Sequence, residues 1–515
     1  MAKYKHYDYS QGKFIPISFD KQILPGTFEH TLHYLIDNEI DLSIFDLRYK
    51  NEETGAPAYD PKILLKIVLY AYSKGITSSR KIADCCNENV IFMALSADTR
   101  PHFTTIADFI SSQDRETVKL FLEVLLICDE MNLIGKEMFA VDGCKLPSNA
   151  SREWSGTKKD LAHKKEKMEK AINQIITRHR EMDRTEADKA VIEKEEQYAS
   201  TLREKVKKIK DWLKDNDDKP GSNGKPRKSN ITDNDSAAMK TSHGVIQGYN
   251  GVAMVDGKHQ VVVHAEAFGE PEPGLLLPMV EKTRANFEAI GQDEDVFKKT
   301  MLTSDSGFHS EKNMQQLMEE GIDAYVADNK FRQRDPRFAK AGRFKEKFKK
   351  ELARRLGRKS IYQPKDFTFS PDMGFCICPA GKRLYRNGGN VLINGKRFIK
   401  FMGSKTNCIP CGLRAQCMKN PAQTVTRQVA YATGKTEYDT ETFSQKMRRK
   451  IDSIAGRLIY SRRMATVEPV FANVRSNLDL DSFTLRGKRK VNIQWLLYCT
   501  VHNLLKVHRY GPGFA

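Results

Sequence analysis

The chain has 515 residues, more than one ordinary hydrophobic core holds, so we expect several domains. Its formal net charge of +19 favours a polyanionic partner, nucleic acid first of all, although a basic protein without such a partner is the alternative. No stretch approaches the roughly 20 apolar residues of a membrane span, and residues 1–9 are polar where a signal peptide would be apolar. These features predict a cytoplasmic protein without membrane contact, whose ten cysteines are mostly reduced.

Residues 1–130 are expected to form an N-terminal, all-helical DNA-binding domain. Pro61 opens an apolar run that Gly75 ends, the pattern of a helix with proline in its first turn. Residues 77–79 then offer N-caps for a short second helix, and another helix begins close after Pro101. Short helices separated by tight turns are typical of a helix-turn-helix, with a plain helical bundle as the alternative. The candidate DNA contacts near the starts of these helices are Arg80, Lys81, Thr104 and Thr105.

A central sheet is expected to begin in residues 136–150, where an apolar run changes into a turn. Strand character returns at 245–255 and at 260–268, joined by a turn at Gly257. The pattern then predicts a helix at 275–290, a strand at 300–304, a helix capped by Ser310 and a strand at 323–327. This alternation predicts a mixed α/β catalytic core. The segments assigned to that core are residues 136–157, 231–329 and 445–515.

Residues 158–230 interrupt the expected core. Apolar residues at spacings of three, four and seven in a highly charged stretch predict amphipathic helices, paired antiparallel. Such an arm suits a structural role or a dimer contact at least as well as it suits DNA. Its last part, residues 215–230, is polar and punctuated by glycine and proline, which predicts a loop.

Residues 330–365 form a basic segment. Between Lys330 and Lys359 there are 14 lysines and arginines against 3 acidic residues, with phenylalanines interleaved. Such a stretch can follow a phosphate backbone, and a solvated basic helix is the alternative. The candidate DNA contacts in this segment are Arg343, Lys347, Arg354 and Arg355.

Residues 366–425 hold a cluster of five cysteines and are expected to form a zinc-ribbon-like insertion. Thiolates in a C-x₂-C knuckle with flanking cysteines are the preferred ligands of a tetrahedral, structural Zn²⁺. Four ligands are needed, and Cys378 is favoured over Cys376 because it precedes a Pro-Ala-Gly turn. Reduced cysteines without a metal are the alternative. The candidate ligands are Cys378, Cys408, Cys411 and Cys417.

Three acidic residues stand in settings that suit metal chemistry. Asp142 ends the apolar run Met-Phe-Ala-Val, where a buried charge would be costly without a cation. Asp305 follows a short strand in the same way. Glu468 is expected on a late helix, and Pro469 directly after it predicts a helix start or a kink at that point. Carboxylates at two strand ends and on a helix can hold two Mg²⁺ or Mn²⁺ ions, and such ions can cut and rejoin DNA.

Motifs spread over nearly the whole chain resemble those of one family. They are Tyr59-Asp60-Pro61 and Thr104-Thr105-Ile106, Asp142-Gly143, residues 232–239 with Gly248-Tyr249-Asn250, Ser304-Asp305-Ser306-Gly307-Phe308, and the cysteine cluster. Tyr460, Arg463, Glu468 and Arg475 resemble a tyrosine–arginine–glutamate–basic signature. Four residues separate arginine from glutamate where the commonest form has three, so Arg462 is a second candidate for the arginine. By these motifs the chain resembles the DDE transposases of bacterial insertion sequences, most closely the insertion-sequence eleven-eighty-two group.

The resemblance implies an RNase H-like core in which Asp142, Asp305 and Glu468 hold two Mg²⁺ or Mn²⁺ ions. It implies metal-dependent cleavage of DNA at the ends of an insertion sequence, followed by strand transfer into target DNA. Arg463 and Arg475 would bind DNA phosphates. The implied partners are terminal inverted repeats and target DNA, bound by a homodimer in the cytoplasm of a bacterium, at the nucleoid.

Two other functions stay open as alternatives. The first is an RNase H-like nuclease that cuts DNA without joining it, because cutting and joining use the same carboxylates. The second is a DNA-binding protein without catalysis, which the presence of Asp142, Asp305 and Glu468 argues against.

Overall fold

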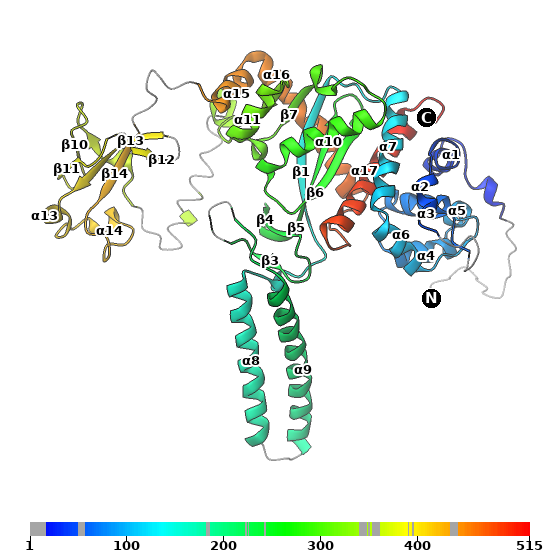
Figure 1. Cartoon of the computed structure of the whole chain (residues 1–515), viewed down its shortest axis with the longest axis horizontal. Coiled ribbons are helices and arrows are strands. Elements are labelled where there is room, and N and C mark those ends of the chain that lie inside the picture. Colours follow the sequence, from blue (N-terminus) through cyan, green and yellow to red (C-terminus); the bar gives the residue numbers. More distant parts are fainter. Residues whose placement is uncertain are drawn as a thin grey trace, which may run out of the picture. The chain divides into compact units, whose positions relative to one another are not determined.

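The structure is a computed structural model, and it describes residues 17–49, 57–181, 186–221, 224, 226–241, 244–338, 348, 351–352, 361–389, 391–393, 396–432 and 441–514 (Figure 1). The chain divides into two compact units. The first unit comprises Met1–Asp328 and Met447–Ala515, and the second comprises Asn329–Lys446. The first unit holds the N-terminal helices, a mixed sheet and a long helical arm, whereas the second holds a small separate sheet.

The N-terminal part of the first unit is helical throughout its described residues. Pro61 opens α3, and the Asp60 side chain accepts a hydrogen bond from the Lys62 amide, so the predicted helix start is confirmed. Helix α4 packs against both α5 and α6. The helices are α1 (Phe28–Tyr34), α2 (Ser43–Asp46), α3 (Pro61–Ser73), α4 (Ser79–Glu88), α5 (Val90–Leu95), α6 (Phe103–Ser112) and α7 (Asp114–Glu130).

The core of the first unit is a mixed sheet with the spatial order β6, β5, β1, β7 and β8. Strands β1, β5 and β6 are antiparallel neighbours, whereas β7 runs parallel to both β1 and β8. The predicted strands are all present, and β4 is an additional strand that pairs with β5 beside β6. The strands are β1 (Met138–Pro147), β4 (Ala237–Thr241), β5 (Gly244–Asp256), β6 (Val262–Phe268), β7 (Met301–Ser304) and β8 (Ala324–Val326).

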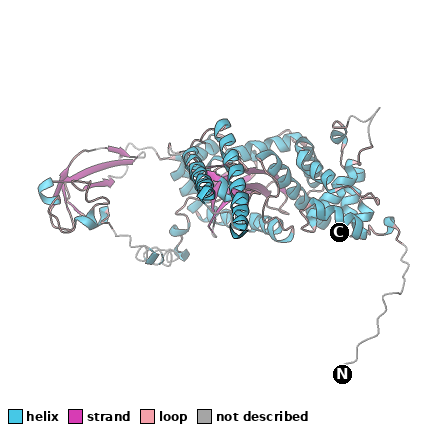
Figure 2. Ribbon diagram, turned by 90° about the horizontal axis from the view of Figure 1, so that it is seen from below, coloured by secondary structure: helices cyan, strands magenta, loops and turns pink. Residues whose placement is uncertain are grey.

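Helices cover the sheet, and Figure 2 shows its strands lying between them. Phe287 of α10 (Leu276–Ala289) stacks on Phe139 of β1, with ring centres 5.7 Å apart. The Trp495 ring lies 3.0 Å from where a Cβ on Gly251 would stand, so any larger residue at that point of β5 would have to displace the ring. The remaining helices of this region are α11 (Glu311–Glu319), α15 (Phe443–Asp452), α16 (Ile454–Ala472) and α17 (Lys488–Tyr510). Ser310 caps α11, as predicted.

Helix α17 joins the N-terminal helices to the sheet. It packs on β6 and also on α3, α6 and α7, and most of its residues are buried. Tyr72 of α3 stacks on Tyr498 of α17 with ring centres 4.5 Å apart. Thr31 Oγ1 of α1 lies 2.8 Å from His508 Nδ1 of the same helix. The N-terminal helices and the sheet therefore share one hydrophobic core.

A pair of long helices, α8 (Lys158–Glu181) and α9 (Glu186–Asp215), forms the arm between β1 and β4. They lie side by side, as predicted (Figure 1). A short antiparallel ladder of β2 (Ser155–Gly156) and β3 (Ser229–Asn230) closes the base of the arm. Two apolar clusters hold the helices together, namely Leu161, Ile209 and Trp212, and Ile172, Leu202 and Val206.

The second unit is built on a small antiparallel sheet. Its strands are β9 (Thr368–Phe369), β10 (Phe375–Ile377), β11 (Arg383–Arg386), β12 (Val391–Ile393), β13 (Lys396–Gly403) and β14 (Gln428–Ala432), and its short helices are α13 (Lys405–Cys408) and α14 (Arg414–Cys417). The core of this sheet contains Phe367, Cys376, Leu384, Ile399, Phe401 and Val429. No helix among the described residues has the length and apolar content that crossing a bilayer requires.

The shared core predicts that loss of the Tyr72–Tyr498 stack destabilises the whole first unit. Tyr72→Ala should lower the free energy of unfolding by about 3–5 kcal/mol, the range for removing a large buried aromatic side chain. Urea unfolding followed by circular dichroism measures this. Tyr198→Ala is the matched control, because Tyr198 is 57% exposed on the arm and should change little. Equal stability of the two variants would contradict a shared core.

Candidate functional site

Asp142 and Asp305 lie next to each other at the point where β7 ends. In the parallel pairing of β1 with β7, Val141 stands opposite Ser304, so the residues that follow them fall at the same level. Asp142 continues β1, whereas Asp305 leaves the sheet and its side chain caps η6 (Ser306–Phe308). Two carboxylates 163 positions apart in the sequence are therefore neighbours.

The charge of Asp142 affects the pKa of Asp305. Burial raises the pKa of Asp305, and the nearby charge of Asp142 raises this pKa further. The Gly307 amide donates a 2.8 Å hydrogen bond to Asp305 Oδ1 and, with the charge of Arg463, acts in the opposite direction without cancelling the shift. A pair of carboxylates in this setting favours a bound cation, because the cation removes the repulsion between two partly buried like charges.

Arg463 supplies a positive charge to this pair. It lies on α16, is 9% exposed, and donates a 2.8 Å hydrogen bond from Nη1 to Asp142 Oδ2. Its guanidinium also lies 5.7 Å from the centre of the Tyr460 ring. Burial alone would lower the pKa of Arg463, but the nearby Asp142, Tyr460 and Asp305 outweigh burial and raise it. The arginine expected to bind DNA therefore contacts the first aspartate in this structure.

Glu468, the third expected acid, is an exposed residue of the same helix and forms no hydrogen bond or ion pair with any residue that the structure describes. Of the two alternatives expected at Pro469, the helix start is wrong, because α16 begins four turns earlier and continues through Pro469 to Ala472, and the kink stays a prediction. Proline lacks the amide that would bond to the Ala465 carbonyl. Gln260 Nε2 donates a 3.1 Å hydrogen bond to that carbonyl instead. A side chain from the β5–β6 turn thus allows the helix to continue.

Arg475 lies in η10 (Asn473–Asn477), a turn of π-helix that directly follows α16, and it is exposed. Burial raises the pKa of Cys144 to about 12, and the charge of Arg475 acts against this shift. Cys144 and Asp142 are two residues apart on β1, so their side chains point to the same face of the sheet. Arg475 therefore lies along the face of the sheet that carries Asp142.

Glu272 is a further carboxylate beside Asp305, and sequence reasoning missed it. It begins η4 (Glu272–Gly274), and its charge contributes to the raised pKa of Asp305. Lys145 Nζ of β1 lies 2.9 Å from Glu272 Oε1. The local sequence, Gly-Glu-Pro-Glu-Pro-Gly, has the appearance of an ordinary surface turn and contains no apolar run that would single out one of its acids.

The donor set at the aspartates suits a hard cation. Carboxylate oxygens are the protein ligands that Mg²⁺ prefers, and a positive guanidinium already lies against Asp142. Among the residues that the structure describes, no three histidine, cysteine, aspartate or glutamate side chains lie close enough together to hold a metal ion as they stand. Two carboxylates are thus in place, and a third ligand would have to move toward them.

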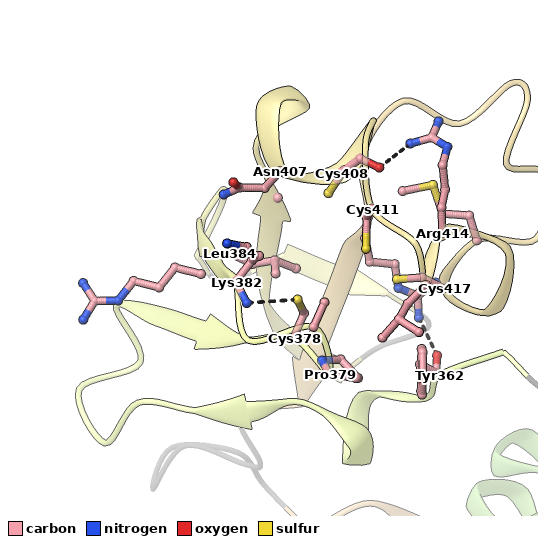
Figure 3. A pocket seen from close by; sticks show the side chains of 16 residues that line it. Tyr362, Cys378, Pro379, Lys382, Leu384, Asn407, Cys408, Cys411, Arg414 and Cys417 are labelled. Carbon is pink, nitrogen blue, oxygen red and sulfur yellow. Dashed lines mark hydrogen bonds between the residues drawn. The ribbon is translucent and has the colours of Figure 1, made fainter.

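In the second unit, the four candidate zinc ligands line one small cavity of about 30 Å³ (Figure 3). Burial raises the pKa of Cys417, and the charges of Cys378, Cys408 and Cys411 raise it further against the opposing charge of Arg427. In the part of the chain that the structure describes, the four thiols do not stand close enough together to hold a metal ion as they are. The Lys382 amide lies 3.4 Å from Cys378 Sγ, as it does in a turn that closes around a thiolate. Cys376 is fully buried in the core of the small sheet and is not among the residues that line this cavity.

The candidate DNA contacts of the N-terminal helices lie close together. The Arg80 guanidinium lies 4.8 Å from the centre of the Phe103 ring, which brings the start of α4 against the start of α6. Lys81 and Thr104 are exposed, and the Thr104 hydroxyl lies 2.8 Å from His102 Nδ1. Five further residues complete the expected set of DNA contacts, namely Arg343, Lys347, Arg354, Arg355 and Thr105. The first four lie outside the described residues, and Thr105 is half-buried on α6.

This fold is a mixed α/β core with a helical N-terminal region and a curled sheet, consistent with the RNase H-like core of DDE enzymes. A family model described as a transposase DDE domain matches residues 377–508, and one described as a transposase domain (DUF772) matches residues 17–112. No curated protein matches the chain. These two matches indicate a DDE transposase of an insertion sequence, from a family of phosphoryl-transfer enzymes that act on DNA.

The ion pair predicts a large effect of removing the guanidinium. Arg463→Met leaves Asp142 and Asp305 adjacent without a counter-charge, so the free energy of unfolding should fall by about 3–5 kcal/mol, as it does when one partner of a buried pair is lost. The loss should be smaller at pH 5 than at pH 8, because the raised pKa of Asp305 lets it take up a proton as the pH falls.

Urea unfolding at the two pH values measures this effect. Arg462→Met is the matched control, because Arg462 is exposed on the same helix. Adding Asp142→Asn to Arg463→Met should restore most of the lost stability, since the repulsion then disappears. A double variant no more stable than Arg463→Met would contradict the electrostatic explanation.

Proposed function

We propose that this chain is a DNA transposase that cleaves DNA at the ends of an insertion sequence and transfers the freed strand into target DNA. The observation that carries the proposal is the placement of Asp142 beside Asp305 at the end of β7, with Arg463 on Asp142. Family membership gives the substrate class, and this pair of carboxylates gives a place for the chemistry.

In this proposal Asp142 and Asp305 bind divalent cations between them. When bound, two Mg²⁺ or Mn²⁺ ions activate the attacking hydroxyl and stabilise the leaving oxygen of the phosphodiester. Arg463 keeps the Asp142 carboxylate oriented through its 2.8 Å hydrogen bond. The guanidinium also balances the negative charge of the pair, so the site stays folded before the substrate arrives.

Glu468 is the proposed third acid because of its place on α16. It lies seven residues before Arg475, about two helical turns, and therefore on roughly the same side of that helical segment. Arg475 lies along the sheet face that carries Asp142, as the pKa of Cys144 indicates. An exposed glutamate without a partner in the described part of the chain is free to rotate toward a cation bound at the aspartates.

DNA would be bound by several surfaces of the chain. Arg80, Lys81 and Thr104 at the starts of α4 and α6 would contact one part of the terminal repeat. Arg475 would hold a phosphate near the cut, because guanidinium groups pair with phosphate oxygens in two parallel hydrogen bonds. The basic segment of residues 330–365 would add salt-dependent affinity. Two chains would be needed to hold the two ends of one element.

Neutral isosteres of the three acids test the catalytic proposal. Asp142→Asn, Asp305→Asn and Glu468→Gln should each reduce Mg²⁺-dependent cleavage at least about 100-fold, since even residues that only orient metal ligands contribute 10–100-fold. Binding of labelled terminal DNA, measured by gel shift, should be unchanged. Glu281→Gln is the control, because Glu281 is exposed on α10.

The products of the wild-type reaction separate the two enzymatic functions. Joined products with a target plasmid are expected, whereas cleavage products alone would indicate a nuclease. Full cleavage activity in Asp142→Asn or Asp305→Asn would overturn the assignment of the site. Full activity in Glu468→Gln alone would remove only the third acid.

We further propose that Cys378, Cys408, Cys411 and Cys417 hold one structural Zn²⁺. Their common cavity and the chemistry of four thiols support it, because Zn²⁺ is bound by four thiolates in structural sites. Thiolates must form before the metal binds, and burial raises the pKa of Cys417. Zinc affinity should therefore fall as the pH is lowered.

Elemental analysis of the purified protein should find about one zinc per chain. Cys411→Ser should lose most of this zinc, whereas Cys85→Ser, on α4 in the first unit, should keep it. Zinc-free wild-type protein purified under reducing conditions would refute the proposal.

A further inference from the structure

Glycines follow both aspartates of the candidate site, and each makes room for a polar side chain. A Cβ on Gly307 would collide with the Glu272 carboxylate and would lie 3.0 Å from Asp305 Oδ1. Oxygens of both carboxylates thus stand within 3.0 Å of one point. A Cβ on Gly143 would lie 2.6 Å from Asn250 Oδ1.

Glu272 reaches this position from a different part of the chain than either aspartate. It begins η4, directly between β6 and α10, and η4 packs against η6, which carries Gly307. The Glu272 side chain is 23% exposed and is held by Lys145, whose Nζ lies 2.9 Å from Glu272 Oε1. Lys145 is three residues after Asp142 on β1. The Lys145 ammonium group thus supplies the positive charge that a bound cation would otherwise supply to the Glu272 carboxylate.

Asn250 lies beside Lys145, on the face of the sheet opposite to that of Asp142. It is 1% exposed, and both its Oδ1 and its Nδ2 lack a hydrogen-bond partner among the described residues. In the β1–β5 ladder Asn250 stands opposite Lys145, so the two side chains leave the same face of the sheet. A buried amide normally has its hydrogen bonds satisfied. A water molecule beside Lys145 would satisfy this one.

We propose that Glu272 is a further ligand of the divalent cation bound at Asp305. The inference rests on the proposed function, because it needs a cation at the aspartates. Oxygen ligands lie about 2.1 Å from Mg²⁺, so a small rotation of Glu272 away from Lys145 brings its carboxylate to an ion that Asp305 holds. Gly307 keeps the path between the two carboxylates open.

The charges around the site favour the replacement of Lys145 by a divalent cation at the Glu272 carboxylate. Asp142, Asp305 and Glu272 carry three negative charges, and Arg463 and Lys145 compensate two of them. A divalent cation replaces the attraction of the ammonium group with a stronger one, because it carries twice the charge at a shorter distance. Lys145 is then free to pair with a DNA phosphate.

Mn²⁺ titration of the zinc-loaded, full-length chain by isothermal calorimetry tests the proposal. Glu272→Gln should weaken Mn²⁺ binding at the aspartates at least about 10-fold. Gly307→Ala should weaken it similarly, because its Cβ displaces the Glu272 carboxylate without removing it. The double variant should bind no more weakly than either single variant. Circular dichroism checks that each variant is folded.

Lys145→Met separates a metal ligand from a purely structural ion pair. If Glu272 binds the cation, removing the competing ammonium leaves Mn²⁺ affinity unchanged or raises it. If the ion pair only maintains the local fold, Lys145→Met weakens Mn²⁺ binding as much as Glu272→Gln does, and the proposal is wrong. Glu281→Gln, exposed on α10, is the matched control and should not change the affinity.

Asp305→Asn distinguishes failure of this inference from failure of the proposed function. If Asp305→Asn loses Mn²⁺ binding while Glu272→Gln keeps it at the wild-type level, Glu272 is not a ligand and the aspartate site stands. If neither change affects Mn²⁺ binding, the cation does not bind at the aspartates, and both proposals fail.

Discussion

The candidate site depends on the ion pair between Arg463 and Asp142. It joins α16, near the C-terminus, to the central strand of the sheet, and it places a positive charge against two carboxylates that would otherwise repel each other. Removal of one partner from a pair as buried as this one is costly, because the other charge is left without compensation. The position of α16 on the sheet, and with it the positions of Glu468 and Arg475, follows from this contact and from the bond between Gln260 and the Ala465 carbonyl.

In the proposed function, the same ion pair would give the site two states of charge. Without a metal, guanidinium and ammonium groups neutralise most of the negative charge at the end of β7. In the proposed function, divalent cations would compete for the same oxygens, so metal binding and release of the basic side chains would be one event. Basic side chains released in this way would face a substrate that is itself a polyanion, which would couple occupation of the site to binding of DNA.

The sequence predicted the elements of the core because its strands and helices have strong, separate patterns. The short strand before Asp305 was enough to place this acid directly after β7. Asp142 was expected at a strand end too, but it lies inside β1, which continues to Pro147, and the parallel register makes the two acids neighbours. The helix start expected at Pro469 was wrong because the compensating donor, Gln260, is more than 200 residues away in the chain. Glu272 was missed for a similar reason. Its only distinguishing feature is its proximity to Gly307, which appears when two turns pack together, and no local pattern carries that information.

Helix α17 has a mechanical consequence. It contacts the N-terminal helices through Tyr498 and His508 and the sheet through Trp495, so the part of the chain that would read the terminal repeat and the part that would cut it move as a single body. A rigid connection of this kind fixes the distance between these two parts of the chain. The cut would fall at a constant number of base pairs from the bases that α4 and α6 contact, and lengthening the spacer between them by half a helical turn of DNA would turn the scissile bond to the opposite side of the duplex.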